Sequence, residues 1–338
     1  MIILSNGLTP TADEGAVKIA VSLIRRIKQS RPDTTVVTYE RQGPESDIHL
    51  NLNKFLLNRP LIRLIREKQE PVLYVPFPSR MLPAALRIFI LSRFARYGLK
   101  TLVVMNGEMN GPARWLIRAG GSQILTVSRQ TWEIYRTLIG NQAKNLKTGV
   151  DTVRFCPADA EKKAALRAKY GLPQDKPIVL HVGHMTPGRN VGKLLGISEN
   201  WHIVLTVSTM TAAQQDVSLR QQLTAKPNLT LFDGFLPDIQ ELYQLADVYL
   251  FPVAEPGHCI DVPLSALEAA ACGIPVAATP YGELTQLLNE PGFYPIETFE
   301  PHALEALLEQ ARREGISPRE SVLDYEWEKT VSNLLLDI

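Results

Sequence analysis

Several features are scarce or absent in this chain of 338 residues, and each absence excludes a class of protein. Cysteine occurs only at Cys156, Cys259 and Cys272, with no CxxC pair, which excludes a zinc ribbon and a disulfide framework and fits a reducing compartment. No apolar run reaches the roughly 18 residues that a membrane-spanning helix needs, because arginines interrupt the nearest one, residues 81–97. The formal net charge of +1 gives no support to a nucleic-acid partner. We therefore expect a soluble or peripheral cytoplasmic protein.

The amino terminus and the length of the chain indicate how the protein begins and divides. Residues 1–7 carry no basic region and only a short apolar run, so we expect a buried strand there and not a signal peptide. A mass of 37.7 kDa is about twice that of a typical single domain, and 45% of the residues are apolar. The composition excludes disorder and predicts two domains that share one cleft.

Short apolar runs, rich in β-branched residues, alternate with helical patterns along the chain. The expected strands are residues 2–5, 35–39, 72–75, 101–105, 123–127, 178–182, 201–207, 229–232, 248–251 and 275–278. The expected helices include residues 15–30, 83–97, 129–139, 158–170, 239–245 and 263–272. About five strands precede Gly149 and about five follow Pro177, so the pattern predicts an α/β protein of two Rossmann-like parallel-sheet domains, joined near residue 150. Ligands of such sheets bind at the carboxyl ends of the strands.

The most informative segment runs from Phe251 to Val276. A strand ends there in a Pro/Gly loop, Pro263 favours the first turn of a helix, and a Gly-Ile-Pro sequence stops that helix. The free N–H groups of Leu264 and Ser265 then suit an anion such as a diphosphate. Glu268, one turn later, would repel phosphate and suits the vicinal hydroxyls of a ribose; the alternative is a solvated helix residue.

A second segment, residues 178–195, places a glycine-containing loop between a strand and a helix. Its spacing of Gly183, Gly188, Arg189 and Asn190 is close to a phosphate-binding Walker A loop, but arginine replaces the lysine and asparagine replaces the magnesium-binding hydroxyl. An ATPase or kinase is therefore disfavoured. A guanidinium in this position can still clamp a diphosphate, and the alternative is a surface arginine.

These segments carry a resemblance to a known family. Together with Thr148-Gly-Val-Asp151, Phe232-Asp-Gly-Phe235 and the run from Leu242 to Pro252, they resemble glycosyltransferase family 4, and Leu267-Glu-Ala-Ala-Ala-Cys-Gly-Ile-Pro-Val276 is similar to its donor-site signature. The resemblance implies a GT-B fold with two domains facing a cleft, a sugar-nucleotide donor, retention of anomeric configuration and no metal or other cofactor. It implies an amino-terminal acceptor domain, residues 1–150, joined by a final helix near 323–338, and a donor-nucleotide domain, residues 151–322.

The resemblance also implies roles for individual residues. Arg189 and Glu268 match the family's diphosphate-binding and ribose-binding positions, and Asp261 is the nearest carboxylate to the position of the family's other glutamate, which is Ile260 here. The family's histidine near the anomeric carbon corresponds to Asn106, and its glycine-rich loop is reduced to Gly15. The implied catalytic residues are Arg189, Glu268 and Asp261; the implied donor-binding residues are His184, Arg189, Asn190, Lys193, Phe235, His258, Leu264, Ser265 and Glu268; the implied acceptor-side residues are Gly15, Asn106 and Glu108.

Two other clusters suggest different chemistry. His181 and His184 bracket a strand end as a metal pair would, although such a pair would straddle a turn. His258 next to Cys259 suggests a thiol nucleophile, but no partner that orients the histidine can be named, so a lining of the donor pocket is the alternative.

The near-neutral total conceals a basic stretch. Residues 54–118 hold twelve Lys and Arg against three acids, a net of +9, so the remainder sums to −8. Within residues 82–96, arginines alternate with Leu, Ile and Phe at helical spacing. This pattern fits a face resting on anionic lipid at the inner side of a membrane; it equally fits a core helix with a solvated basic rim.

The sequence as a whole predicts a retaining glycosyltransferase of the hexosyltransferase type. Its partners would be a nucleoside-diphosphate sugar, a glycan or lipid-linked acceptor and an anionic membrane surface. A catalytically silent sugar-nucleotide-binding subunit and a sugar-nucleotide epimerase of the same fold are the alternatives.

Overall fold

The computed structural model describes residues 1–8, 15–51, 58–77, 81–104, 108–207, 216–255 and 257–336. The chain divides into two compact units, Met1–Thr148 with Trp327–Ile338, and Gly149–Glu326. Each unit is built on its own parallel sheet. The predicted α/β class with two Rossmann-like sheets is confirmed.

The first unit contains a sheet in which the described residues form seven strands, in the order β3-β2-β1-β4-β5-β6-β7. The order reverses beside β1, which pairs with both β2 and β4, as in other doubly wound sheets. The strands are β1 (Ile2–Gly7), β2 (Thr35–Arg41), β3 (Ile48–His49), β4 (Val72–Val75), β5 (Leu99–Val103), β6 (Gln123–Thr126) and β7 (Ala143–Asn145).

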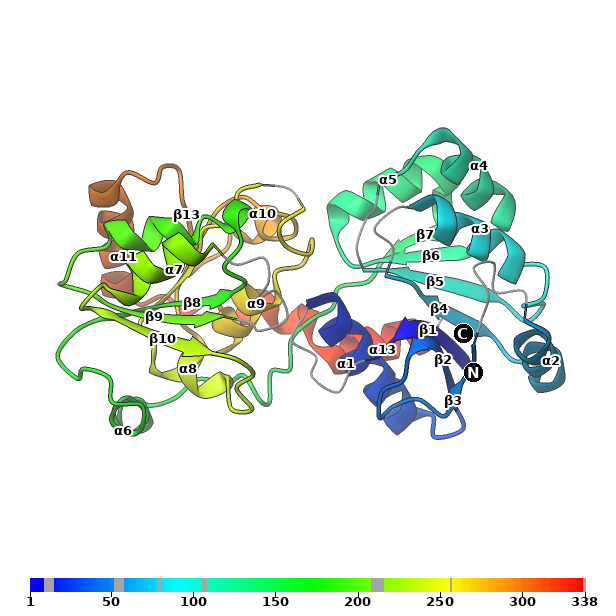
Figure 1. Ribbon diagram of the computed structural model, residues 1–338, viewed down its shortest axis with the longest axis horizontal. Helices are drawn as coiled ribbons and strands as arrows, with labels where there is room; N and C mark the ends of the chain where they lie inside the picture. Colours follow the sequence, from blue (N-terminus) through cyan, green and yellow to red (C-terminus); the bar gives the residue numbers. More distant parts are fainter. Residues whose placement is uncertain are drawn as a thin grey trace. The chain divides into compact units, whose positions relative to one another are not determined.

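Helices cover both faces of this sheet (Figure 1). One face carries α2 (Arg59–Lys68), α3 (Met81–Leu91), α4 (Gly111–Gly120) and α5 (Arg129–Ile139), which ends in η1 (Gly140–Gln142). Their apolar sides, including Leu61, Ile88 and Tyr135, form one core with the strands. The other face carries α1 (Gly15–Ser30) and α13 (Trp327–Leu336), where the Arg26 guanidinium lies 5.6 Å from the Trp327 ring. The last helix therefore belongs to the first unit.

The second unit contains a parallel sheet with the order β10-β9-β8-β11-β12-β13 among its described residues. The strands are β8 (Ile178–Gly183), β9 (His202–Val207), β10 (Leu229–Asp233), β11 (Val248–Phe251), β12 (Val276–Ala278) and β13 (Phe293–Pro295). The order reverses beside β8, which pairs with β9 and β11. The loops after β8 and β11 therefore leave the sheet at the position where doubly wound folds bind ligands.

The helices of the second unit also form two layers. On one face, η3 (Val191–Gly196), α7 (Val217–Thr224) and α11 (Pro301–Glu314) bury Leu194, Leu223 and Leu308 in one core. On the other lie α6 (Ala160–Lys169), α8 (Gln240–Leu245) and α9 (Leu264–Ala271). Shorter elements complete the unit: η2 (Pro187–Arg189), α10 (Leu284–Leu287), α12 (Arg319–Val322) and η5 (Leu323–Tyr325).

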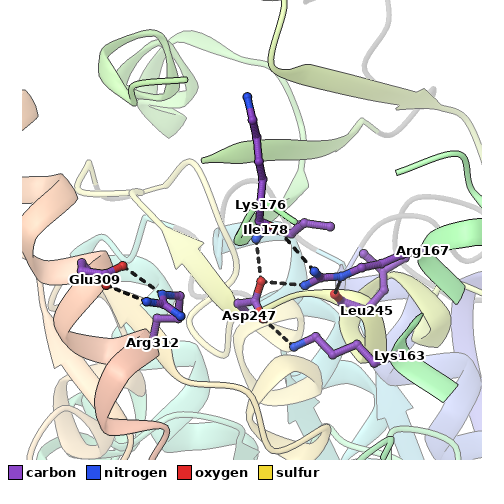
Figure 2. A network of polar contacts seen from close by, with 8 residues as sticks. All are labelled: Lys163, Arg167, Lys176, Ile178, Leu245, Asp247, Glu309 and Arg312. Carbon is purple, nitrogen blue, oxygen red and sulfur yellow. Dashed lines mark hydrogen bonds and ion pairs between the residues drawn. The ribbon is translucent and has the colours of Figure 1, made fainter. Parts of the chain in front are cut away.

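A polar network holds the amino-terminal edge of this second sheet (Figure 2). One carboxylate oxygen of Asp247 lies 2.6 Å from Nζ of Lys163, and the other accepts hydrogen bonds of 2.6 Å each from Nη2 of Arg167 and the N–H of Ile178. Arg167 also donates from Nε to the carbonyl of Leu245. The network therefore fastens α6 to the start of β8 and to the segment that leads into β11.

Several expected boundaries are wrong. The helix expected at 83–97 is α3, which ends at Leu91. The chain turns there, and the Ser92 hydroxyl donates a hydrogen bond to the carbonyl of Phe89. The strand expected at 101–105 begins two residues earlier, at Leu99. The charge of Lys100 hides this start in the sequence, although Lys100 is buried within the strand. The expectation of about five strands in each half missed β3, β7 and β13, which are edge strands too short to give a pattern.

Candidate functional site

The carboxyl end of β8 brings together Gly183, Arg189 and the loop before α9. Arg189 is only 8% exposed, and its Nε donates a hydrogen bond of 2.8 Å to the carbonyl of His258. A Cβ on Gly183 would lie 2.8 Å from Nη1 of Arg189, so this glycine makes room for the guanidinium. The arginine is thus a fixed, buried cation at the ligand-binding edge of the sheet.

Within the described residues, no carboxylate forms a hydrogen bond or ion pair with Arg189. Its guanidinium lies beside the thiol of Cys259. Burial raises the pKa of that thiol, and the neighbouring arginine opposes the rise. A buried cation is costly without an opposite charge, so this position suits an anion. The raised pKa disfavours a thiolate, and with it the alternative of a Cys259 nucleophile.

The loop around Arg189 is held by two further contacts. A Cβ on Gly188 would lie 2.1 Å from Cδ2 of the His258 ring, so only glycine leaves space for this side chain. Asn190 adopts a left-handed conformation with φ of 55° and donates from Nδ2 to the carbonyl of Pro252 at 3.1 Å. The two contacts join the loop after β8 to the loop after β11.

Helix α9 begins with an uncapped amino terminus. Its N-cap residue is Pro263, whose side chain has no atom that could accept a hydrogen bond from the first turn. The N–H groups of Ala266 and Leu267 bond to the carbonyl of Pro263, whereas those of Leu264 and Ser265 come too early for a bond inside the helix. The predicted anion-binding geometry of this helix end is therefore available in the structure.

Glu268 lies one turn inside α9 and is 3% exposed. Its Oε2 accepts a hydrogen bond of 3.0 Å from the hydroxyl of Tyr243, whose pKa is raised by burial and by the nearby carboxylate. Tyr249 lies between this carboxylate and the end of β8: its hydroxyl donates to the carbonyl of Val182 at 3.3 Å and bonds with Ser265. Two tyrosines thus connect the acidic side chain to the sheet edge, and the solvated-helix alternative for Glu268 is wrong.

His181 lies directly beneath this edge and is fully buried. Its Nδ1 lies 2.9 Å from the carbonyl of Leu250, and no group among the described residues forms a hydrogen bond with Nε2. Burial lowers the pKa of His181 to about 4, and the charge of Arg189 adds to this, so the ring is neutral near pH 7. Within the described residues, no group of three or more His, Cys, Asp or Glu could hold a metal ion.

The other residues expected on the donor side are more dispersed in the second unit. His184 and Asp261 are half-buried, and the carbonyl of Asp261 accepts the N–H of Glu283 at 2.8 Å. Lys193 is exposed, with Nζ 5.4 Å from the Phe299 ring, and Phe235 is 55% exposed. Ile260, at the position where the related family has a glutamate, is 9% exposed.

The positions expected on the acceptor side belong to the first unit. Gly15 is the first residue of α1, and Glu108 is exposed, with its carbonyl accepting the N–H of Met81. Asn106 lies outside the described residues. Sequence reasoning missed Tyr249 and the partnership of Tyr243 with Glu268. Tyr243 falls within the Leu242–Pro252 run, but a contact between residues 25 apart gives no local signal.

Comparisons with known proteins show which families and structures the chain is similar to. Residues 176–313 match the family model described as "Glycosyl transferases group 1". The chain is 28% identical over 217 residues to a D-inositol 3-phosphate glycosyltransferase of Salinispora tropica, covering 56% of this chain and 44% of that one. It is 28% identical over 195 residues to a GDP-mannose-dependent alpha-mannosyltransferase of Mycobacterium tuberculosis, covering 55% and 48%. The chain thus spans about half the length of these curated relatives.

Solved structures match along the whole chain. A glycosyltransferase from Rickettsia africae gives a TM-score of 0.78 at 16% identity, covering 99% of this chain and 97% of that one. Anabaena Alr3699/HepE in complex with UDP gives a TM-score of 0.76 at 14% identity, covering 100% and 99%. These likenesses show the shared GT-B fold.

Proposed function

We propose that this chain, whose residues 176–313 belong to the group 1 glycosyltransferases, transfers a hexose from a nucleoside-diphosphate sugar to an acceptor hydroxyl with retention of configuration. The acceptor would be a glycan or a lipid-linked sugar. The second unit would bind the donor nucleotide, and the first unit, with Gly15, Asn106 and Glu108, would face the acceptor.

One observation carries the proposal: a buried arginine, with no carboxylate bonded to it among the described residues, lies at the carboxyl ends of the strands of a sheet that also carries a helix with no N-cap side-chain bond. The diphosphate of the donor would supply the missing negative charge to Arg189. The N–H groups of Leu264 and Ser265 would bind its oxygens at the positive end of the helix.

Glu268 would bind the hydroxyls of the donor ribose. The hydroxyl of Tyr243 fixes the carboxylate of Glu268 through a hydrogen bond of 3.0 Å. The carboxylate oxygens that would accept hydrogen bonds from the ribose are therefore oriented before the ligand arrives. A carboxylate in this place favours the neutral hydroxyls of a sugar over a second phosphate. The ribose of the nucleotide would therefore lie next to the second turn of α9.

The same groups would promote the reaction. As the glycosidic bond to the diphosphate breaks, negative charge grows on the leaving oxygen, and preorganised donors at that oxygen stabilise the transition state more than the ground state. Arg189 and the first N–H groups of α9 would supply these donors, with Asn190 and His258 holding the loop in place. The acceptor hydroxyl would attack from the side of the leaving group. No metal is assigned a role.

A second candidate is a protein that binds a nucleotide sugar without turnover. Ile260 favours it, because a buried apolar side chain stands where the related family has a carboxylate. Asp261 follows directly and would have to serve in its place. The two candidates share the same donor site and differ in whether sugar is transferred.

A thermal-shift screen with UDP, GDP, ADP and dTDP tests the donor site. A ligand at about 100 times its dissociation constant stabilises the folded state by about 2.7 kcal/mol. We expect one nucleotide to raise the melting temperature of the wild type but to have little effect on Arg189→Ala and Glu268→Ala. Arg313→Ala, an exposed change on α11, is the control and should respond like the wild type. An unchanged affinity in both site variants would refute the assignment.

Turnover separates the two candidates. Release of the nucleoside diphosphate from the matching nucleotide sugar in the presence of acceptor mixtures supports the transferase. Nucleotide binding without any release in all mixtures supports the silent binding protein.

A further inference from the structure

The outer surface of α3 and α4 in the first unit is both apolar and basic. We define the α3–α4 face by six side chains: Leu82, Phe89, Arg93, Arg114, Trp115 and Arg118. Trp115 is 63% exposed and Leu82 is 38% exposed, so two large apolar side chains face solvent on adjacent helices. The inner sides of the same helices, including Ile88 and Ile117, are buried against the sheet. The side chains of the α3–α4 face are therefore not needed to complete the hydrophobic core of the first unit.

The two helices are held in close and fixed contact. The N–H of Met81 bonds to the carbonyl of Glu108 at one end of the pair, and a Cβ on Gly120 would lie 3.4 Å from Ile88 at the other end. Figure 1 shows α3 and α4 side by side over the sheet. Between them, the rings of Phe89 and Trp115 lie 6.1 Å apart. The aromatic pair thus forms the centre of a rigid surface.

Arginines surround this aromatic pair. The Arg93 guanidinium lies 4.4 Å from the centroid of the Phe89 ring, and Arg118 donates from Nε to the carbonyl of Leu138 at 3.1 Å. Arg93, Arg114 and Arg118 are all exposed. Glu108 is the one acid in the sequence between Met81 and Gly120, so the charge of the face is almost entirely positive.

We infer that the α3–α4 face binds the surface of a bilayer that contains anionic phospholipids. Guanidinium groups would meet lipid phosphates, and Trp115 and Leu82 would enter the interface, where an amphipathic ring is favoured. A nucleic acid would satisfy the arginines but would give Leu82 no apolar environment. In the described part of the chain, no helix is long and apolar enough to cross a membrane. This inference concerns the first unit and goes beyond the proposed sugar transfer.

Co-sedimentation with lipid vesicles tests the inference on the whole chain. We expect binding to vesicles of phosphatidylcholine with phosphatidylglycerol, little binding to phosphatidylcholine alone, and a loss of binding as salt increases. Each arginine near an anionic surface contributes roughly five-fold in affinity, so Arg114→Gln with Arg118→Gln should weaken binding by roughly 25-fold. Lys162→Gln with Lys226→Gln, two changes in the second unit, is the matched control and should bind like the wild type.

Tryptophan fluorescence tests whether Trp115 enters the lipid interface, which binding through charge alone would not require. Vesicles should shift the emission to shorter wavelength in the wild type and in Trp132→Phe, but not in Trp115→Phe. The response of each variant to nucleotide reports the fold and the donor site independently. The inference is overturned if anionic vesicles do not bind, if the arginine pair and its control behave alike, if the shift survives in Trp115→Phe, or if single-stranded DNA competes as well as the vesicles do.

Discussion

The hydroxyl of Tyr243 on α8 donates a hydrogen bond to Oε2 of Glu268 on α9, and both side chains are buried. Removing one partner of a buried bond to a charged group costs roughly 1 to 3 kcal/mol, because the other keeps its desolvation penalty. We therefore expect Tyr243→Phe to lower the free energy of unfolding by roughly that amount and to weaken nucleotide binding. Urea denaturation and nucleotide titration measure the two effects.

Tyr170→Phe is the matched control for this change. The hydroxyl of Tyr170 also donates to a glutamate on α8, Glu241, but that pair is partly exposed. Its loss should cost less than about 1 kcal/mol and leave nucleotide affinity unchanged. Equal effects of the two substitutions on nucleotide affinity would contradict the orienting role of Tyr243.

The contact between Gly188 and His258 gives a second prediction. A methyl group on Gly188 would overlap the His258 ring, and moving His258 would displace the carbonyl that holds Arg189. We expect Gly188→Ala to reduce stability by roughly 1 to 3 kcal/mol and to weaken nucleotide binding. In a His258→Ala background the space is free, so the same change should cost much less. A double-mutant cycle measures this coupling, and additive effects would show that the two residues act independently.

Much of this site is predictable from local sequence. Pro263 and the Gly-Ile-Pro stop define α9, and the strand followed by Gly183 and Gly188 locates Arg189, because these signals depend on neighbouring residues. The partners of these groups are not predictable in the same way. Tyr243 meets Glu268 only because α8 and α9 pack on the same face of the sheet.

The first unit shows the same limit. A basic, apolar stretch is visible in the sequence, but helical spacing does not decide which side of α3 faces the sheet. Only the packed structure shows that Ile88 is buried while Trp115, on the neighbouring helix, is exposed next to Phe89. Edge strands such as β3 and β7 were missed since two or three residues carry no periodicity.

His181 predicts a dependence of stability on acid. Its pKa is about 4 in the folded protein, against 6.5 for an unperturbed histidine. As the pH falls from 6.5 to about 4, the unfolded chain takes up a proton that the folded chain does not, so the free energy of unfolding falls, by about 3 kcal/mol in total. Above pH 6.5 both states are neutral and this dependence disappears.

His181→Gln tests this assignment, because glutamine can still donate to the carbonyl of Leu250 but does not titrate. Urea denaturation at several pH values should give a shallower slope for the variant between pH 6.5 and about 4, by close to one proton. The half-buried His202, whose pKa burial also lowers, contributes equally to both proteins and cancels in the comparison. Parallel slopes would mean that His181 is protonated in the folded state.

The last prediction concerns Asp247 and its polar network (Figure 2). This network lies at the amino-terminal ends of the strands of the second sheet, whereas the candidate site lies at their carboxyl ends. The carboxylate of Asp247 compensates Arg167, whose side chain is 9% exposed, and also binds Lys163 and the N–H of Ile178. Asp247→Asn keeps the shape but leaves a buried guanidinium uncompensated, so we expect a loss of roughly 3 kcal/mol in the free energy of unfolding.

Glu309→Gln is the control for this change. It removes the partner of Arg312 and the largely exposed Arg313, and it should cost less than about 1 kcal/mol. Nucleotide affinity should stay unchanged in both variants, because the network lies at the strand ends away from Arg189; a selective loss of affinity in Asp247→Asn would instead connect the two edges of the sheet.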